Sequence, residues 1–282
     1  MTDKGIKYRK LKDKLFFVYI ICGSLIIIVP IFYILYYIVL KGISSINWEF
    51  FVSLPSPPGE TGGGIANALV GTLILLILSG LFAIAPSIAL GIYLSEHRSS
   101  KLANSVRLGV EILQSVPSIV IGIIVYIWIV RPLGGFNALS GGIALALMMI
   151  PIITKSTEET LKLIPNSLKE ASMALGVPNY KTILRIILPA GLSGILNGIL
   201  IAIARVSGET APLLFTAFGN PFMSTNILKP INNLPLLIFN YAGSPYKDWH
   251  ALAWGASFVL VVFVLLMNII AKIIAKRWKV QF

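Results

Sequence analysis

Residues 170–189 read EASMALGVPNYKTILRIILP, and this stretch decides how the rest of the chain is organised. It is too polar to cross a bilayer and too apolar for an idle linker, and long hydrophobic segments lie on both sides of it. Asn166 or Ser167 can cap a short helix that leads into the stretch. Gly176 can end that helix, and Pro178 can open the next one. The pattern predicts a compact helical loop between membrane segments.

One face of the short helix is apolar and small. The positions i, i+3, i+4 and i+7 are occupied by Leu168, Ala171, Ser172 and Leu175. Such a face suits close docking into a groove of another protein. A helix lying on the membrane surface would have the same spacing, so that alternative stays open.

The overall composition is that of a membrane protein. Of 282 residues, 56% are hydrophobic and 12% charged, with a mean hydropathy of +0.87, whereas a soluble domain has about 25% charged residues. The net charge of +12 does not indicate nucleic-acid binding, because the basic residues lie at the ends of apolar segments rather than in one patch. Cys22, His97 and His250 are isolated, so neither a disulfide framework nor a metal site is expected.

Six apolar segments predict six membrane-spanning helices, because about 20 apolar residues cross the hydrocarbon core of a bilayer. The predicted fold is therefore an all-α, polytopic membrane protein. A basic tail precedes the first span, which lacks a cleavage site and is expected to be retained, and the last five spans form a core over 67–275. The tails are 1–14 and 276–282, and the spans cover 15–40, 67–94, 108–130, 138–154, 190–218 and 251–275.

The basic residues predict the orientation of the chain. With the N-terminus inside, 18 of the 23 Lys and Arg residues fall in the cytoplasmic segments, if Lys272 at the inner end of the last span is included, and four fall in the outer ones. Because cytoplasmic loops are enriched in Lys and Arg, both termini and the loop 155–189 are expected in the cytoplasm. The Gly/Pro-rich loop 41–66 and the loop 219–250 are then extracytoplasmic. No Gly-x4-Gly-Lys-Ser/Thr motif occurs, so ATP hydrolysis is not expected of this chain.

The fifth span carries small and charged residues close to one face. Gly194, Gly198 and Ala202 recur every four residues, and Arg205 and Glu209 continue the series. Small residues let another helix approach closely. Because an ionised side chain in lipid is costly, the two charges are expected to face the bundle interior or a water-filled path.

Two roles for Arg205 and Glu209 are open at this point. Four residues apart, they can pair with each other and fix the register of the helix. Alternatively, Arg205 meets an anion in a translocation path and Glu209 orients it, since the planar guanidinium donates two parallel hydrogen bonds to a phosphate. Pro212 cannot donate to the Gly208 carbonyl, which predicts a kink.

The loop also carries a family resemblance. Its order of Glu-Ala-Ser, Gly, Ile and Leu-Pro is similar to the EAA loop of ABC-importer permeases, whose usual third residue is Ala. In that family the loop forms a coupling helix seated on an ATP-hydrolysing subunit. The resemblance implies a type I, MetI-like permease fold, and it implies coupling roles for the matching residues, which are Glu170, Ala171, Ser172, Gly176, Ile186, Leu188 and Pro189.

A second resemblance concerns the substrate. ARVSGETAPLLFTAF (204–218) resembles the fifth-helix signature of PstA-type subunits of phosphate-specific ABC permeases. The likeness extends over most of residues 60–260. It includes the stretches GGGIANALVGTL (62–73), SVPSIVIG (115–122) and LPLLIFNYAGSPYKDWHALAWGA (234–256). It implies functional roles for the residues that match the family's Arg and Glu, which are Arg205 and Glu209.

The resemblance further implies a set of partners in a prokaryotic plasma membrane. These are a sister PstC-type permease, two ATPase subunits and an extracytoplasmic phosphate-binding protein. ATP and magnesium would bind the partner ATPase, and no cofactor is expected on this chain. Two alternatives stay open: a permease of the same build for molybdate, sulfate or an amino acid, and an ion-coupled secondary transporter. The latter would have internal repeats and paired broken helices, which the sequence does not reveal.

Overall fold

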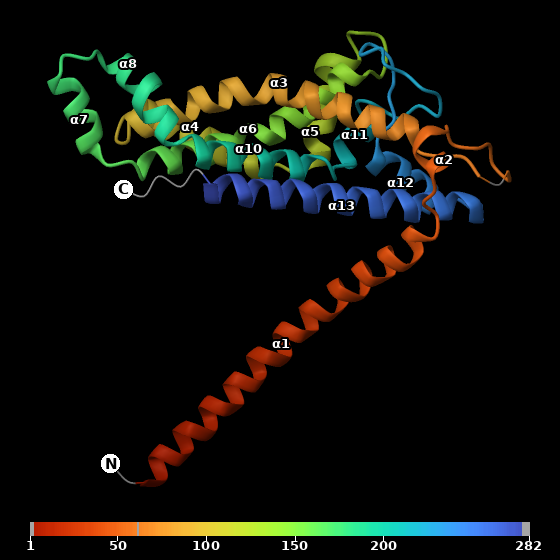
Figure 1. Ribbon diagram of the computed structural model, residues 1–282, viewed down its shortest axis with the longest axis horizontal. Coiled ribbons are helices and arrows are strands. Elements are labelled where there is room, and N and C mark those ends of the chain that lie inside the picture. Colours follow the sequence, from red (N-terminus) through yellow and green to blue (C-terminus); the bar gives the residue numbers. More distant parts are fainter. Residues whose placement is uncertain (1–2, 61, 278–282) are drawn as a thin grey trace.

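The computed structural model describes residues 3–60 and 62–277, so the first two residues of the predicted tail 1–14 and most of the tail 276–282 lie outside the described residues. Within these ranges the regular structure is helical (Figure 1). Four helices are long and apolar enough to cross a membrane, and six spans result if each of two bent helix pairs counts as one. The chain is a helical, multi-pass membrane protein.

Each of the four long helices contains one of the predicted apolar runs and extends beyond it. They are α1 (Asp3–Ile43), α3 (Ala66–Glu96), α6 (Ala138–Lys162) and α13 (Lys247–Arg277). Helix α1 extends away from the other helices, and the C-terminal part of α1 contacts α13 (Figure 1). There the rings of Tyr37 and Trp254 lie 5.5 Å apart. Most of α1 is therefore left to lipid or to a partner.

Helix α6 is the centre of the bundle, because it packs along α3 on one side and α10 (Leu192–Val206) on another. Its residues Leu145, Met149 and Ile153 are fully buried in the main apolar core. Helices α3 and α6 approach closely where Gly91 faces Thr157, since a Cβ on this glycine would lie 2.5 Å from the Thr157 Cβ. The core thus depends on small residues as well as large apolar ones.

The third predicted span, 108–130, is broken. Helix α4 (Lys101–Ser115) meets α5 (Ser118–Val125) and the π-helical η1 (Tyr126–Val130) at an angle of 101°. The break lies at Val116 and Pro117. A residue before proline prefers extended backbone, and Val116 has φ −65° and ψ 128°. The sequence therefore contained the signal for an elbow that hydropathy alone conceals.

The fifth predicted span, 190–218, is also interrupted. The segment 179–190 meets α10 at an angle of 67°. This segment comprises α8 (Asn179–Thr182), the π-helical η2 (Ile183–Ile187) and α9 (Leu188–Ala190). Helix α10 then ends at Val206, and the short α11 (Ala211–Leu214) follows. Broken helices, which the apolar pattern of the sequence does not reveal, are thus present in two spans.

Two further helices lie in segments predicted as loops. Helix α2 (Trp48–Val52) lies within 41–66 and α12 (Leu234–Ala242) within 219–250. Asn233 caps α12, because its side-chain oxygen accepts the Leu236 N–H at 2.9 Å. Helices α2, α11 and α12 lie at one end of the bundle, and α7 and α8 lie at the other (Figure 1). The predicted coupling loop and the predicted outer loops are therefore at opposite ends.

Candidate functional site

The predicted coupling loop begins with helix α7, which spans Asn166–Ala174. Pro165 occupies its N-cap position with φ −58° and ψ 135°, and no side chain caps the helix. The expected capping by Asn166 or Ser167 is therefore wrong. The extended backbone that a proline favours leads the chain into the helix instead.

Gly176 ends α7, as the sequence predicted. It adopts φ +78°, a conformation that glycine reaches without steric cost. Its N–H donates to the Met173 carbonyl at 2.9 Å, and the Val177 N–H donates to the Ser172 carbonyl at 3.3 Å. This pair of bonds is a Schellman cap. The sharp stop fixes the length of α7.

The outward side of α7 is exposed and partly apolar. Glu170 and Ala171 are exposed, and Leu175 is 85% exposed. The predicted docking face is divided, because Leu168 is half-buried and Ser172 is buried. Met173 is also exposed, so more than one apolar side chain on or next to α7 is left uncovered.

Ser172 ties α7 to the helix that follows it. Its hydroxyl lies 2.8 Å from the Thr182 hydroxyl, and both residues are buried. A buried hydroxyl without a partner is costly, so the two groups satisfy each other. This contact is a physical reason for Ser at a position where the EAA pattern usually has Ala.

The second half of the motif anchors the loop in the bundle. Ile186 and Leu188 are half-buried, whereas Pro189 is exposed in the first turn of α9. The neighbouring Ile187 is buried in an apolar cluster with Leu161, Ile164 and Ile195. The motif therefore presents its first half outward and attaches its second half to α6 and α10.

Gly194 and Gly198 lie where α10 packs against α6. A Cβ at Gly194 would overlap the Thr160 side chain, and a Cβ at Gly198 would overlap Ser156. The Ser156 hydroxyl also donates to the Gly194 carbonyl at 3.2 Å. The two glycines thus allow a close approach of the helices, with a hydrogen bond across the contact.

Arg205 lies in the last turn of α10, with an exposed side chain. The helix ends at Val206, and the half-buried Glu209 lies beyond it. Both residues are within the described part of the chain, and no ion pair joins them there. The predicted pairing across one helical turn is therefore wrong, because the turn that would align the two residues is not helical.

Pro212 breaks the span rather than kinking it. It lies in the first turn of α11, where its missing N–H needs no helical partner. Its carbonyl accepts the Thr216 hydroxyl at 2.8 Å. On its other side is Gly122 of α5, where a Cβ would lie only 2.7 Å from the Pro212 Cα. The two broken spans therefore touch backbone to backbone close to Arg205 in sequence.

Residues of the third span and Arg205 line the same small hollow. Its lining includes Gln114, Arg205 and the apolar Val116, Met148 and Pro151. Gln114 lies in the last turn of α4, directly before the elbow. A guanidinium and an amide, both hydrogen-bond donors, thus border one small hollow that apolar side chains also line.

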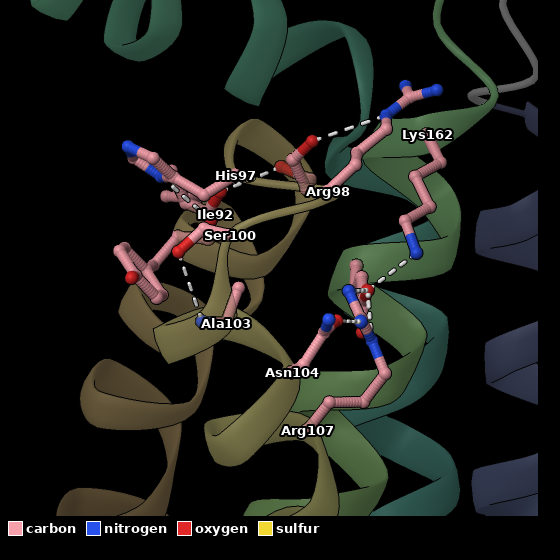
Figure 2. Close-up of polar contacts among 11 residues, drawn as sticks. Ile92, His97, Arg98, Ser100, Ala103, Asn104, Arg107 and Lys162 are labelled. Atoms are coloured by element: carbon pink, nitrogen blue, oxygen red, sulfur yellow. Dashed lines mark hydrogen bonds and ion pairs between the residues drawn. The ribbon is translucent and has the colours of Figure 1, made fainter.

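A buried carboxylate links α4 to α6 (Figure 2). Arg107 donates from Nε (3.1 Å) and Nη2 (2.8 Å) to Glu158 Oε1, and Lys162 Nζ lies 2.5 Å from the same oxygen. Asn104 accepts a bond from Arg107 Nη1 at 2.9 Å. Arg107 thus pairs with Glu158 on the packed helix, whose side chain is 7% exposed, rather than with Glu111 one turn away on α4.

Two polar links were missed by sequence reasoning. Glu158 and Lys162 lie four apart on α6, a helical pairing that could have been noticed. The second link is the ion pair of Lys169 with Glu96, which joins α7 to the end of α3. These residues are 73 positions apart, so spacing carries no signal for their contact.

Comparison with known proteins places these features in a family. Residues 87–280 match the family model described as binding-protein-dependent transport system inner membrane component. The phosphate transport system permease protein PstA of Yersinia pestis is 42% identical over 96% of this chain and 92% of its own length. The probable PstA of Methanocaldococcus jannaschii is 37% identical over 91% of both chains.

The fold has solved counterparts. A chain of the inward-facing MetNI methionine ABC transporter superimposes with a TM-score of 0.65 and covers 77% of this chain and 96% of its own. The sequence identity is 21%, so this likeness concerns the fold alone. The fold of most of this chain is therefore shared with a chain of that transporter.

Proposed function

Because this chain belongs to the binding-protein-dependent transport system inner membrane components, and within them to the PstA-type permeases, we propose that it carries inorganic phosphate into the cell. The observation that carries the proposal is Arg205, an exposed cation in the last turn of a broken apolar span. A charged side chain facing lipid is costly, so Arg205 is expected to face a water-filled path. That path would lie against a second permease subunit.

The chain is the permease subunit of an ABC importer, and ATP hydrolysis belongs to a separate subunit. We assign two ATPase subunits, a PstC-type sister permease and an extracytoplasmic phosphate-binding protein as its partners. The membrane is a prokaryotic plasma membrane, with both termini and α7 on the cytoplasmic side. The excess of Lys and Arg in the cytoplasmic segments supports this orientation.

Arg205 and Gln114 are proposed to contact phosphate in transit. The guanidinium suits an oxyanion because it donates parallel hydrogen bonds from a planar fork. With no carboxylate paired to it among the described residues, Arg205 keeps its full charge for the anion. Glu209, half-buried three residues beyond the helix end, is not paired with Arg205, and we propose that its negative charge weakens retention of the anion. A transport site must hold its ion weakly enough for release.

The transport step is proposed to follow alternating access. Closure of the ATPases moves α7, and the two broken spans change their angle so that the path opens first outward and then inward. The Ser172–Thr182 contact keeps α7 and α8 together during this movement. Helix breaks at Pro117 and at residues 207–210 provide joints at which the spans can bend.

The proposal is tested by uptake of labelled phosphate at micromolar concentration in cells with and without this gene. Excess sulfate and molybdate are added as competitors, and an Arg205→Gln strain is measured beside the wild type. We expect a gene-dependent component that only phosphate competes away and that Arg205→Gln removes. Competition by sulfate or molybdate would show that the chain transports a different substrate. Gene-dependent uptake that Arg205→Gln left intact would remove Arg205 from the path.

A further inference from the structure

We propose that the ion pair between Lys169 and Glu96 transmits movement of α7 to α3 during ATP-coupled transport. We call this ion pair the strut, and both of its residues are positioning residues. The proposal rests on the proposed function, since it assigns a role within the same transport cycle. Lys169 Nζ contacts Glu96 Oε2, and the two side chains are 28% and 17% exposed. The pair joins α7 directly to the last residue of α3.

Helix α7 has few other attachments to the bundle. Among the described residues, its remaining side-chain hydrogen bond is Ser172 to Thr182, which leads to α8 within the same loop. Its apolar attachment is Leu168, half-buried against the cluster of Leu161 and Ile187. The Lys169–Glu96 pair is thus the direct polar contact between α7 and a long spanning helix. A push on α7 reaches α3 through this pair without passing along the chain.

Helix α3 is suited to pass the movement on. It packs along most of α6, and the Gly91–Thr157 approach leaves no space between the two backbones to absorb a shift. One residue further along α6, Glu158 binds Arg107 of α4, the helix that leads to the elbow at Pro117. The contacts from Lys169 therefore continue through packed helices to the side of the hollow that holds Arg205.

The surroundings of the pair allow it to open and close. It borders a polar cleft of about 300 Å³ whose lining includes Ser95, Arg98 and Asn166. Solvent in such a cleft screens the two charges, so the pair is weaker than a fully buried one. Arg98 also donates from Nε to the Ser95 carbonyl at 3.4 Å, which keeps this second cation at the rim. A pair of moderate strength can be remade in each cycle.

The test is a charge exchange in the assembled transporter. Glu96→Lys, Lys169→Glu and the double exchange are each reconstituted with the partner subunits in proteoliposomes. Phosphate uptake and ATP hydrolysis are measured in the same vesicles. We expect each single reversal to lower the phosphate moved per ATP by about five-fold or more, the size of a typical coupling between sites. The double exchange, which restores opposite charges, is expected to return the ratio to within about two-fold of wild type.

Lys181→Glu is the matched control, because this lysine is exposed on α8 of the same loop and has no ion pair among the described residues. It should leave the ratio unchanged. Single reversals with a normal ratio, or a double exchange as poor as either single one, would overturn the proposal. So would Lys181→Glu matching Lys169→Glu, since the effect would then arise from charge at the ATPase surface.

Failure of the proposed function is distinguishable from failure of the strut. If the wild-type complex moves no phosphate, the substrate assignment is wrong. The strut is then judged from ATP hydrolysis alone, as its stimulation by the extracytoplasmic binding protein. Single reversals should abolish that stimulation and the double exchange should restore it. Stimulation that persisted in both single variants would reject the strut.

Discussion

Replacing Gly122 with Ala tests whether the two broken spans meet as closely as the structure shows. A Cβ at this position would lie 2.7 Å from the Pro212 Cα and 3.0 Å from the Pro212 carbonyl oxygen. Carbon atoms in ordinary contact are about 3.5–4.0 Å apart. Because the neighbouring atoms belong to backbone, no side chain can rotate away, and α5 must separate from α11 by roughly 1 Å to restore such a contact.

The steric cost of Gly122→Ala, in free energy of unfolding, is isolated by comparison with a matched glycine in the same span. Overpacking of this kind costs about 1–3 kcal/mol. Replacing glycine by alanine in a helix also gains about 1 kcal/mol of helix propensity, and Gly109→Ala in α4 has the same gain. A Cβ at Gly109 would meet no atom within 4 Å. The difference between the two variants therefore isolates the steric cost, at about 1–3 kcal/mol.

The assay is the thermal unfolding midpoint of the assembled complex. One kcal/mol shifts the midpoint of a domain of this size by about 2–4 °C, so Gly122→Ala should melt roughly 2–12 °C below Gly109→Ala. Phosphate uptake should fall as well, because Pro212 follows the break that ends the Arg205 helix. Equal melting temperatures and equal uptake for the two variants would refute the close contact.

Three other substitutions are predicted together. Arg205→Gln should abolish phosphate uptake while the subunit still co-purifies with its partners; loss of assembly instead would mean that the side chain serves packing. Gly176→Ala should destabilise the end of α7 by about 1–2 kcal/mol because Gly176 has a positive φ, and Gly176→Asn should have a milder effect. ATP hydrolysis and phosphate uptake, measured together, should show uncoupling. An unaltered ratio of phosphate moved to ATP hydrolysed would contradict this prediction. Glu158→Gln should lower the melting midpoint, at a cost of about 1–3 kcal/mol, since it leaves the part-exposed Arg107 and Lys162 without their shared carboxylate. An unchanged midpoint would argue that water satisfies both cations.

Much of the helical layout could be predicted from hydropathy, because lipid demands long apolar helices. The long helices α1, α3, α6 and α13 coincide with apolar runs that contain few charges. The breaks were concealed because a run remains apolar whether it is straight or bent. Pro117 and Pro212 were the available signals, and a proline is compatible with a kink as well as with a break.

The coupling loop was more accessible than the polar contacts around it. Gly176 and the following Pro178 mark helix ends by local backbone preference, which sequence reports directly. The Arg205–Glu209 pairing failed because it assumed helical spacing beyond Val206. Lys169 and Glu96 meet only after α3, α6 and α7 are packed, and such a contact depends on tertiary structure alone.

ATP dependence of phosphate uptake in reconstituted vesicles tests the central claim most directly. The wild-type subunit, its sister permease, the ATPases and the binding protein are combined, and labelled phosphate is followed with ATP, without ATP, and with ATP plus a proton ionophore. We predict uptake that requires ATP and is unaffected by the ionophore. Uptake that continued without ATP and collapsed with the ionophore would contradict a permease driven through its cytoplasmic loop.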